Sequence, residues 1–117
     1  MATDWSDDIA IAELSDEPAL SEDLNAIIER VGRQDKAPNV VLNLADVTYL
    51  NSSNIAQLLK LHHALTAAER RMKLCHVCDE VWSILMVTSL DKYFDFAPDT
   101  MTALAGLQLD DADKADG

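Results

Sequence analysis

The sequence predicts an α/β domain in which a mainly parallel sheet of four to five strands is covered by about four helices. Short apolar runs suited to strands alternate with longer amphipathic stretches suited to helices along the whole chain. Such alternation is typical of parallel sheets with helices on their faces. The length of 117 residues, with 49% hydrophobic side chains, fits one domain, and a domain of this size buries a core without disulfides or a metal.

The first expected unit is a strand followed by a helix. The apolar run of residues 9–14 predicts the strand, and the acidic residues and proline of 16–18 indicate that a helix starts nearby. The apolar side chains of the next stretch recur at helical spacing and line one face: Leu20, Leu24, Ile27, Ile28 and Val31. We expect this face to pack on the sheet.

The central strand and a second helix come next. Residues 39–44 form an apolar run without strict alternation, which suits a strand covered on both faces. Residues 51–54 read Asn-Ser-Ser-Asn, and the side-chain oxygens of Asn and Ser accept free amides in the first turn of a helix. The amphipathic stretch of residues 55–70 then predicts a helix, with His62 as a packed, structural side chain.

Two further strands and two further helices complete the expected order. Residues 72–77 predict a strand, and Asp79 is expected to cap a helix that runs to Thr88. A short last strand is expected at residues 95–96, and a final helix from residue 98 to about Leu107.

The third of these helices carries two large side chains beside its buried face. The residues expected to be buried recur at helical spacing: Val81, Ile84, Leu85 and Thr88. At about 100° per residue, Trp82 and Met86 lie next to this stripe but outside it. Trp and Met are favoured at the centres of protein interfaces, so we predict that both side chains bind a partner.

Charge is distributed unevenly along the chain. Its formal net charge is −12, and residues 1–29 carry nine acidic side chains and no Lys or Arg. Such a surface repels polyanions, so we expect no binding to nucleic acid. We expect residues 1–8 to be a flexible acidic segment, residues 9–107 to form the domain, and residues 108–117 to be an acidic tail.

No apolar run is long enough to span a membrane, and no signal peptide is recognisable, so we expect a cytoplasmic protein without membrane insertion. The only cysteines are Cys75 and Cys78. Three extended residues separate their Cα atoms by roughly 10 Å, which is too far for a disulfide. We therefore expect two free thiols.

Two segments resemble a known family. The strand of residues 40–44 and the Asn-Ser-Ser-Asn-Ile turn that follows at 51–55 are similar to the strand and Asp-Ser-Ser-Gly-Leu turn of STAS domains, the family of bacterial anti-sigma factor antagonists. The Leu-Asp-Lys-Tyr-Phe segment of residues 90–94 looks like that family's closing segment. The resemblance covers residues 9–107 and implies a STAS-like single domain.

The resemblance implies a protein that is switched by phosphorylation. In the family, a serine kinase that is itself the anti-sigma factor phosphorylates the first serine of the pair, here Ser52. The unphosphorylated antagonist binds this kinase, phosphorylation ends the binding, and a phosphatase resets the switch. The resemblance therefore implies a partner-binding turn made of Asn51, Ser52, Ser53 and Asn54.

Two residues of the turn depart from the family's usual pattern. Asn51 stands in place of Asp, and Asn54 in place of Gly. Because an Asn in the first turn of a helix costs little relative to Gly, we expect Asn54→Gly to alter phosphorylation more than stability.

Enzyme classes fit the sequence less well. A response-regulator receiver would need a phosphate-accepting carboxylate where Asn43 stands, and an amide cannot accept the phosphoryl group. No glycine-rich phosphate loop and no nucleophile and base at a recognisable spacing occur. We therefore expect no enzyme activity, no cofactor and no metal. The alternative function is a STAS interaction subunit, not phosphorylated, in a larger signalling or lipid-transport complex.

Overall fold

The sheet contains five strands in the order β1-β2-β3-β4-β5. The computed structural model describes residues 2–6, 8–33 and 35–116. Strand β1 is antiparallel to β2, whereas the β2–β3, β3–β4 and β4–β5 pairs are parallel. The strands are β1 (Ala2–Trp5), β2 (Ile9–Ser15), β3 (Asn39–Asp46), β4 (Met72–Cys75) and β5 (Asp95–Ala97). The α/β fold class expected from the sequence is confirmed.

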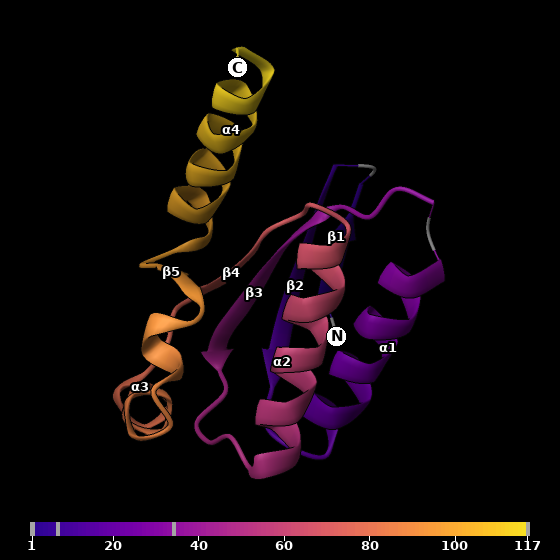
Figure 1. The fold of residues 1–117 in the computed structure, drawn as a ribbon. Helices are drawn as coiled ribbons and strands as arrows, with labels where there is room; N and C mark the ends of the chain where they lie inside the picture. The colour runs from indigo at the N-terminus through magenta and orange to yellow at the C-terminus, as the bar shows by residue number, and fades with distance from the viewer. Residues whose placement is uncertain (1, 7, 34, 117) are drawn as a thin grey trace.

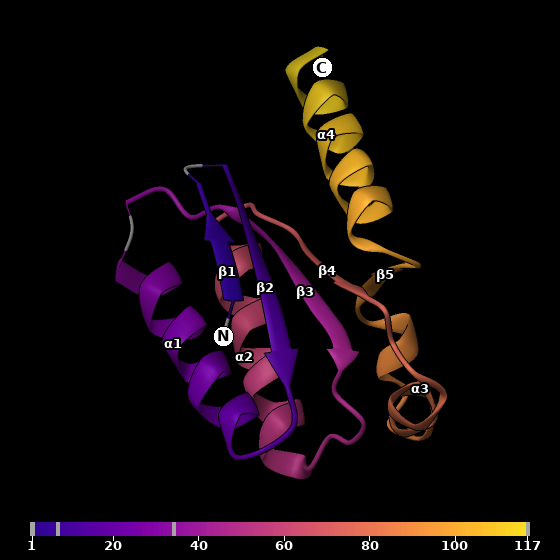
Figure 2. The ribbon, with the colours of Figure 1, turned by 180° about the vertical axis from the view of Figure 1, so that it is seen from behind.

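Helices lie on both faces of this sheet (Figure 1). Helices α1 and α2 lie side by side, and Figure 2 shows α2 passing behind β1 and β2 when the molecule is turned round. Helix α4 packs on the opposite face through Ala103 and Leu107, which contact Val41 and Cys75. The helices are α1 (Ala19–Arg33), α2 (Ser52–Ala67), α3 (Asp79–Val87), the short 3₁₀ helix η1 (Leu90–Lys92) and α4 (Thr100–Asp116).

Strand β3 is covered on both faces of the sheet, which explains why apolar and polar residues do not alternate in its sequence. Val40, Leu42 and Leu44 belong to the larger core cluster beneath α1, α2 and α3. Val41 points the other way, into the smaller cluster beneath α4. Because successive side chains of a strand face opposite sides of the sheet, a strand covered on both faces has to be apolar at nearly every position.

The N-terminal segment differs from the expectation. Residues 1–8 were expected to be flexible, but Ala2–Trp5 form strand β1 and pair with β2 from Ala2 opposite Glu13 to Trp5 opposite Ala10. Trp5 packs on the larger core cluster, and the guanidinium carbon of Arg30 lies 4.1 Å from the centre of its ring. The exposed Asp4 shows that acidic side chains at a sheet edge can remain in water, so local charge did not exclude a strand.

The last two helices also differ in detail. Helix α4 continues to Asp116, beyond the expected end at about Leu107 and through residues 108–116 of the expected tail; residue 117 lies outside the described residues. Neither Gly nor Pro occurs between residues 107 and 116 to stop it. Helix α3 begins after Cys78 rather than with Asp79 as its cap, and Thr88 is exposed instead of buried.

Both cysteines are free, as expected; Cys75 is buried and Cys78 is half-buried. Among the helices in the described ranges, none combines the length and the apolar character that crossing a membrane requires.

His62 joins α2 to the segment that leads into β5. Its ring centre lies 4.7 Å from that of Tyr93 and 5.5 Å from that of Phe94. Its Nδ1 atom is buried and has no hydrogen-bond partner among the residues that the structure describes. Burial lowers the pKa of His62, the neighbouring His63 lowers it further, and Asp95 opposes both effects. The fold therefore favours neutral His62.

We predict that His62 makes the protein less stable as the pH falls below about 6.5, the ordinary pKa of histidine. Because the pKa is lowered in the folded state, the unfolded chain takes up the proton first, and stability is lost between that value and the lower folded pKa. Thermal unfolding of His62→Phe should depend less on pH between about 7.5 and 5.5. The exposed His63 provides the control: His63→Gln should keep most of the pH dependence, and equal slopes for His62→Phe and the wild type would contradict the prediction.

Candidate functional site

The candidate site lies where the parallel strands end and α2 begins. Strand β3 ends at Asp46, and a short connection follows. Val47 and Leu50 are buried in the larger core cluster, and the thiol of Cys78 donates to the carbonyl of Val47 at 3.4 Å. The buried side chains of Val47 and Leu50 therefore hold this loop in place and determine where α2 starts.

Asn51 and Asn54 cap the first turn of α2 reciprocally. The side-chain oxygen of Asn51 accepts from the backbone amide of Asn54 at 2.8 Å. In return, the side-chain oxygen of Asn54 accepts from the backbone amide of Asn51 at 3.0 Å. This capping box occupies two amides that the helix itself leaves free. Ser52 and Ser53, which lie between the two asparagines, are exposed.

Asn54 has a structural role that the sequence analysis missed. Its side chain is fully buried, with 0% exposure, and its amide nitrogen lies 3.4 Å from both the Ser21 hydroxyl and the Gln57 side-chain oxygen. The expectation that Asn54 contacts a partner is therefore wrong, because no partner surface can reach it. We expected Asn54→Gly to alter phosphorylation more than stability, but the burial and hydrogen bonds of the Asn54 side chain now predict a loss of stability as well.

Two carboxylates from the β2–α1 connection reach this edge. The Asp16 carboxylate accepts from the Thr48 amide at 2.8 Å and from its hydroxyl at 2.6 Å, which ties the connection to the loop before α2. The Glu17 carboxylate accepts from the amide and the hydroxyl of Ser21 in α1. These hydrogen bonds lower the pKa of both carboxyl groups. Both acids precede α1, as the sequence indicates, and they also reach this edge because the carboxyl ends of neighbouring parallel strands meet there.

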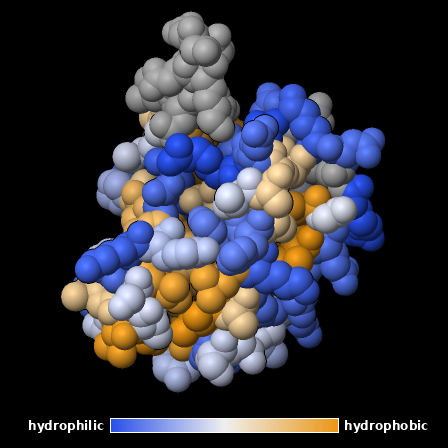
Figure 3. All heavy atoms as spheres, viewed as in Figure 1, coloured by the Kyte–Doolittle hydropathy of each residue, from blue (hydrophilic) through white to orange (hydrophobic). Residues whose placement is uncertain are grey.

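Trp82 and Met86 lie on α3, at the same end of the molecule as the start of α2 (Figures 1 and 2). Their exposed fractions are 37% and 54%, whereas Val81 and Leu85 are buried, so both lie beside the stripe as expected. The Trp82 ring also meets Phe96 edge-on, with the ring centres 4.9 Å apart. Figure 3 shows apolar side chains gathered over α3 and between α3 and α2. Tyr49, in the loop that leads from β3 to α2, is a further exposed aromatic residue, which no pattern in the sequence singled out.

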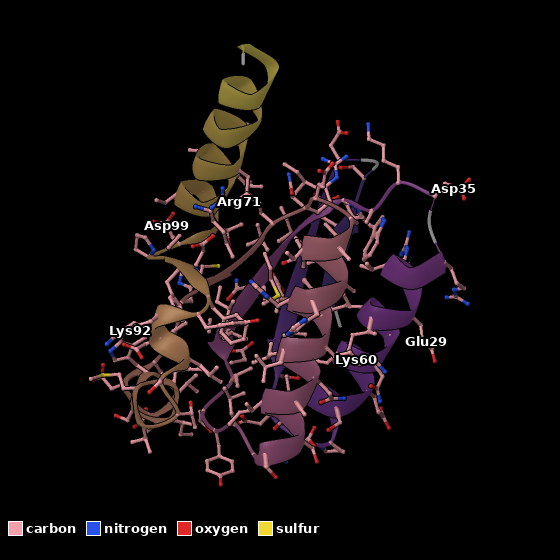
Figure 4. The ribbon with its side chains drawn as sticks, viewed as in Figure 1. Glu29, Asp35, Lys60, Arg71, Lys92 and Asp99 are labelled. Carbon is pink, nitrogen blue, oxygen red and sulfur yellow. The ribbon has the colours of Figure 1, made fainter. Side chains whose placement is uncertain are left out.

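Basic residues are absent from the three sequence segments that build this edge. Residues 1–29, 37–59 and 74–91 contain no Lys or Arg. Figure 4 shows Lys60 further along α2 and Arg71 near the opposite end of the sheet, where Arg71 pairs with Asp95 at 2.9 Å. The three segments are therefore acidic, and Lys92 of η1 is a basic residue beside α3 (Figure 4).

The chemistry available at this edge is that of a modifiable hydroxyl. Within the described ranges, no group of three or more His, Cys, Asp or Glu side chains is placed to hold a metal ion. Ser52 and Ser53 present hydroxyls to solvent at a helix N-terminus, where the helix dipole favours added negative charge.

The comparisons with known proteins agree with this fold. The family model described as "STAS domain" matches residues 14–103. No curated protein sequence matches the chain. A crystal structure described as an anti-sigma factor antagonist, from Thermotoga maritima, is similar to the fold with a TM-score of 0.78 at 14% identity, covering 92% of this chain and 93% of its own.

Two further solved structures are similar. An anti-sigma-factor antagonist (STAS) domain protein from Planctomyces limnophilus has a TM-score of 0.78 at 15% identity, with 92% of this chain and 97% of its own covered. The anti-sigma factor antagonist SpoIIAA in its unphosphorylated form has a TM-score of 0.64 at 15% identity, with 99% of each chain covered. At such low identity these likenesses concern the fold.

We predict that Asn54→Gly lowers the free energy of unfolding by about 1 to 3 kcal/mol, since it removes one half of the capping box and leaves the half-buried Asn51 amide without its acceptor. Chemical denaturation measures the loss. Ser53→Ala is the matched control, because Ser53 is exposed in the same turn and its substitution should change stability by less than about 0.5 kcal/mol. Equal stability of the two variants would show that the capping box contributes little.

Proposed function

The chain belongs to the STAS domain family, and from this premise we propose that it is a phospho-switchable protein-binding module that antagonises an anti-sigma factor. The observation that carries the proposal is the position of Ser52. Its hydroxyl is exposed in the first turn of α2, between two asparagines whose hydrogen bonds hold the turn. A kinase can therefore reach Ser52 without unfolding the helix.

The proposed switch is the transfer of one phosphoryl group. The Ser52 oxygen attacks the γ-phosphorus of ATP, its proton passes to a base of the partner kinase, and ADP leaves. The product carries about −1.5 to −2 added charges at a helix N-terminus, which the free amides and the dipole of the helix tolerate. A phosphatase transfers the group to water and resets the switch. We propose that both reactions take place in the bacterial cytoplasm.

The unphosphorylated form is the one that binds the partner. An exposed serine can lie in a packed interface at small cost, whereas a phosphate there has to lose its water, and its desolvation opposes binding. Release therefore needs no large conformational change. Asn51, Ser52 and Ser53 form one part of the proposed interface, and Trp82 and Met86 of α3 form the other.

The charges around these residues restrict the partner. Asp79 and Glu80 are exposed in the first turn of α3, next to the apolar surface of Trp82 and Met86. A surface that complements this arrangement has an apolar pocket with a basic rim. We propose that the anti-sigma factor kinase presents such a surface.

Ser52 is predicted to be the phosphate acceptor. Incubation with ATP and a serine kinase of the anti-sigma factor type, followed by mass spectrometry, should locate one phosphate at Ser52, and Ser52→Ala should abolish it. Ser53→Ala, the matched control, should still be phosphorylated. Phosphate at neither serine would overturn the switch and favour the alternative function, an interaction subunit without phosphorylation.

Trp82→Ala is predicted to weaken the binding of the unphosphorylated protein to its partner kinase by about tenfold or more. The reason is that a large aromatic anchor at an interface contributes about 2 kcal/mol. Isothermal titration calorimetry measures the affinity, and thermal unfolding checks the fold. Met101→Ala provides the control, since Met101 is 81% exposed on α4 and should bind normally. If Trp82→Ala unfolded much more readily and bound the partner normally, Trp82 would belong to the core.

A further inference from the structure

Glu17 joins the start of α1 to the turn that carries Ser52. Its carboxylate accepts from both the amide and the hydroxyl of Ser21. The same Ser21 hydroxyl lies 3.4 Å from the side-chain nitrogen of Asn54, and Asn54 is locked to Asn51 by the capping box. A continuous set of polar contacts therefore runs from Glu17 to the residues on either side of the serine pair.

The carboxylate also lies close to the turn itself. The pKa of Glu17 is lowered first by the hydrogen bonds from Ser21 and to a smaller extent by the side chains of Asn54 and Asn51. Asn51 immediately precedes Ser52 in the chain. Glu17 thus carries its negative charge at the helix N-terminus that a phosphate on Ser52 would also occupy.

The chain supplies little positive charge to separate two anions at this place. Glu17 lies in the segment of residues 1–29 and Ser52 in the segment of residues 37–59, and neither segment contains a Lys or Arg. Glu17 is itself exposed, so its side chain can swing into water when another anion arrives. Two negative charges near the same helix N-terminus repel each other, and salt screens the repulsion.

We infer that Glu17 transmits the phosphorylation state of Ser52 to α1: a phosphate on Ser52 drives the Glu17 carboxylate away from Ser21 and frees the first turn of α1. This inference rests on the proposed function, which brings the phosphate to Ser52. It makes Glu17 a positioning residue, because Glu17 holds Ser21 and through it the buried Asn54. The phosphate then changes two elements of the surface, the start of α2 and the start of α1.

The test introduces phosphoserine at position 52 during protein synthesis, so that it does not depend on a kinase. Proton–nitrogen correlation spectra then follow the Ser21 amide, which donates to Glu17. We expect the phosphate to shift this resonance toward the position that it has in unmodified Glu17→Gln. In the Glu17→Gln background, the phosphate should shift it far less, and high salt should reduce the shift in the wild type.

Glu29→Gln is the matched control. Glu29 is an exposed carboxylate further along α1, as Figure 4 shows, and its substitution removes the same charge. The phosphate should shift the Ser21 resonance in this variant as in the wild type. Thermal unfolding adds a second measurement: the phosphate should lower the melting temperature more in the wild type and in Glu29→Gln than in Glu17→Gln.

The inference is overturned if the phosphate leaves the Ser21 resonance unchanged, or shifts it equally with and without Glu17. These outcomes are separate from failure of the proposed function. A kinase that leaves Ser52 unmodified would remove the switch, while the coupling measured with synthetic phosphoserine would remain. Conversely, phosphorylation of Ser52 without a response at Ser21 would retain the switch and remove the role of Glu17.

Discussion

The reciprocal hydrogen bonds between Asn51 and Asn54 are the constraint on which the candidate site depends. They end the loop after β3 and start α2 at a defined residue. Because the Asn54 side chain is buried and contacts Ser21, the same two residues also set how α2 meets α1. Ser52 and Ser53, which lie between the two asparagines, are exposed to solvent. A turn that is rigid on its inner side and exposed on its outer side is well suited to modification.

The sheet places three independent features at the same edge. Parallel strands end together, so the connections after β2, β3 and β4 lie next to one another. They supply, respectively, the carboxylates of Asp16 and Glu17, the turn with Ser52, and helix α3 with Trp82. The parts of these connections that follow each strand directly, within residues 1–29, 37–59 and 74–91, contain no Lys or Arg. An apolar surface beside exposed carboxylates complements a basic protein surface and repels a polyanion.

The departures from the family's usual turn are compatible with its architecture. An Asn at position 51 caps the helix as an Asp would, because its side-chain oxygen accepts the same amide. An Asn at position 54 adds a side chain where the family usually has none, and the fold accommodates it by burying it against α1. The similar folds at 14% and 15% identity show that this architecture forms with largely different side chains.

Local patterns in the sequence determined the fold class, the order of the strands and helices from residue 9 onward, the helix start at the serine pair, and the position of Trp82 and Met86 beside a buried stripe. Each of these follows from periodicity or capping within a few residues. Only the tertiary structure decided that Ala2–Trp5 add a strand, that Asn54 is buried, and that Ser21 meets Asn54 across 33 positions of the chain. These features depend on contacts between distant segments, and such contacts exist only once the sheet has brought the ends of its strands together.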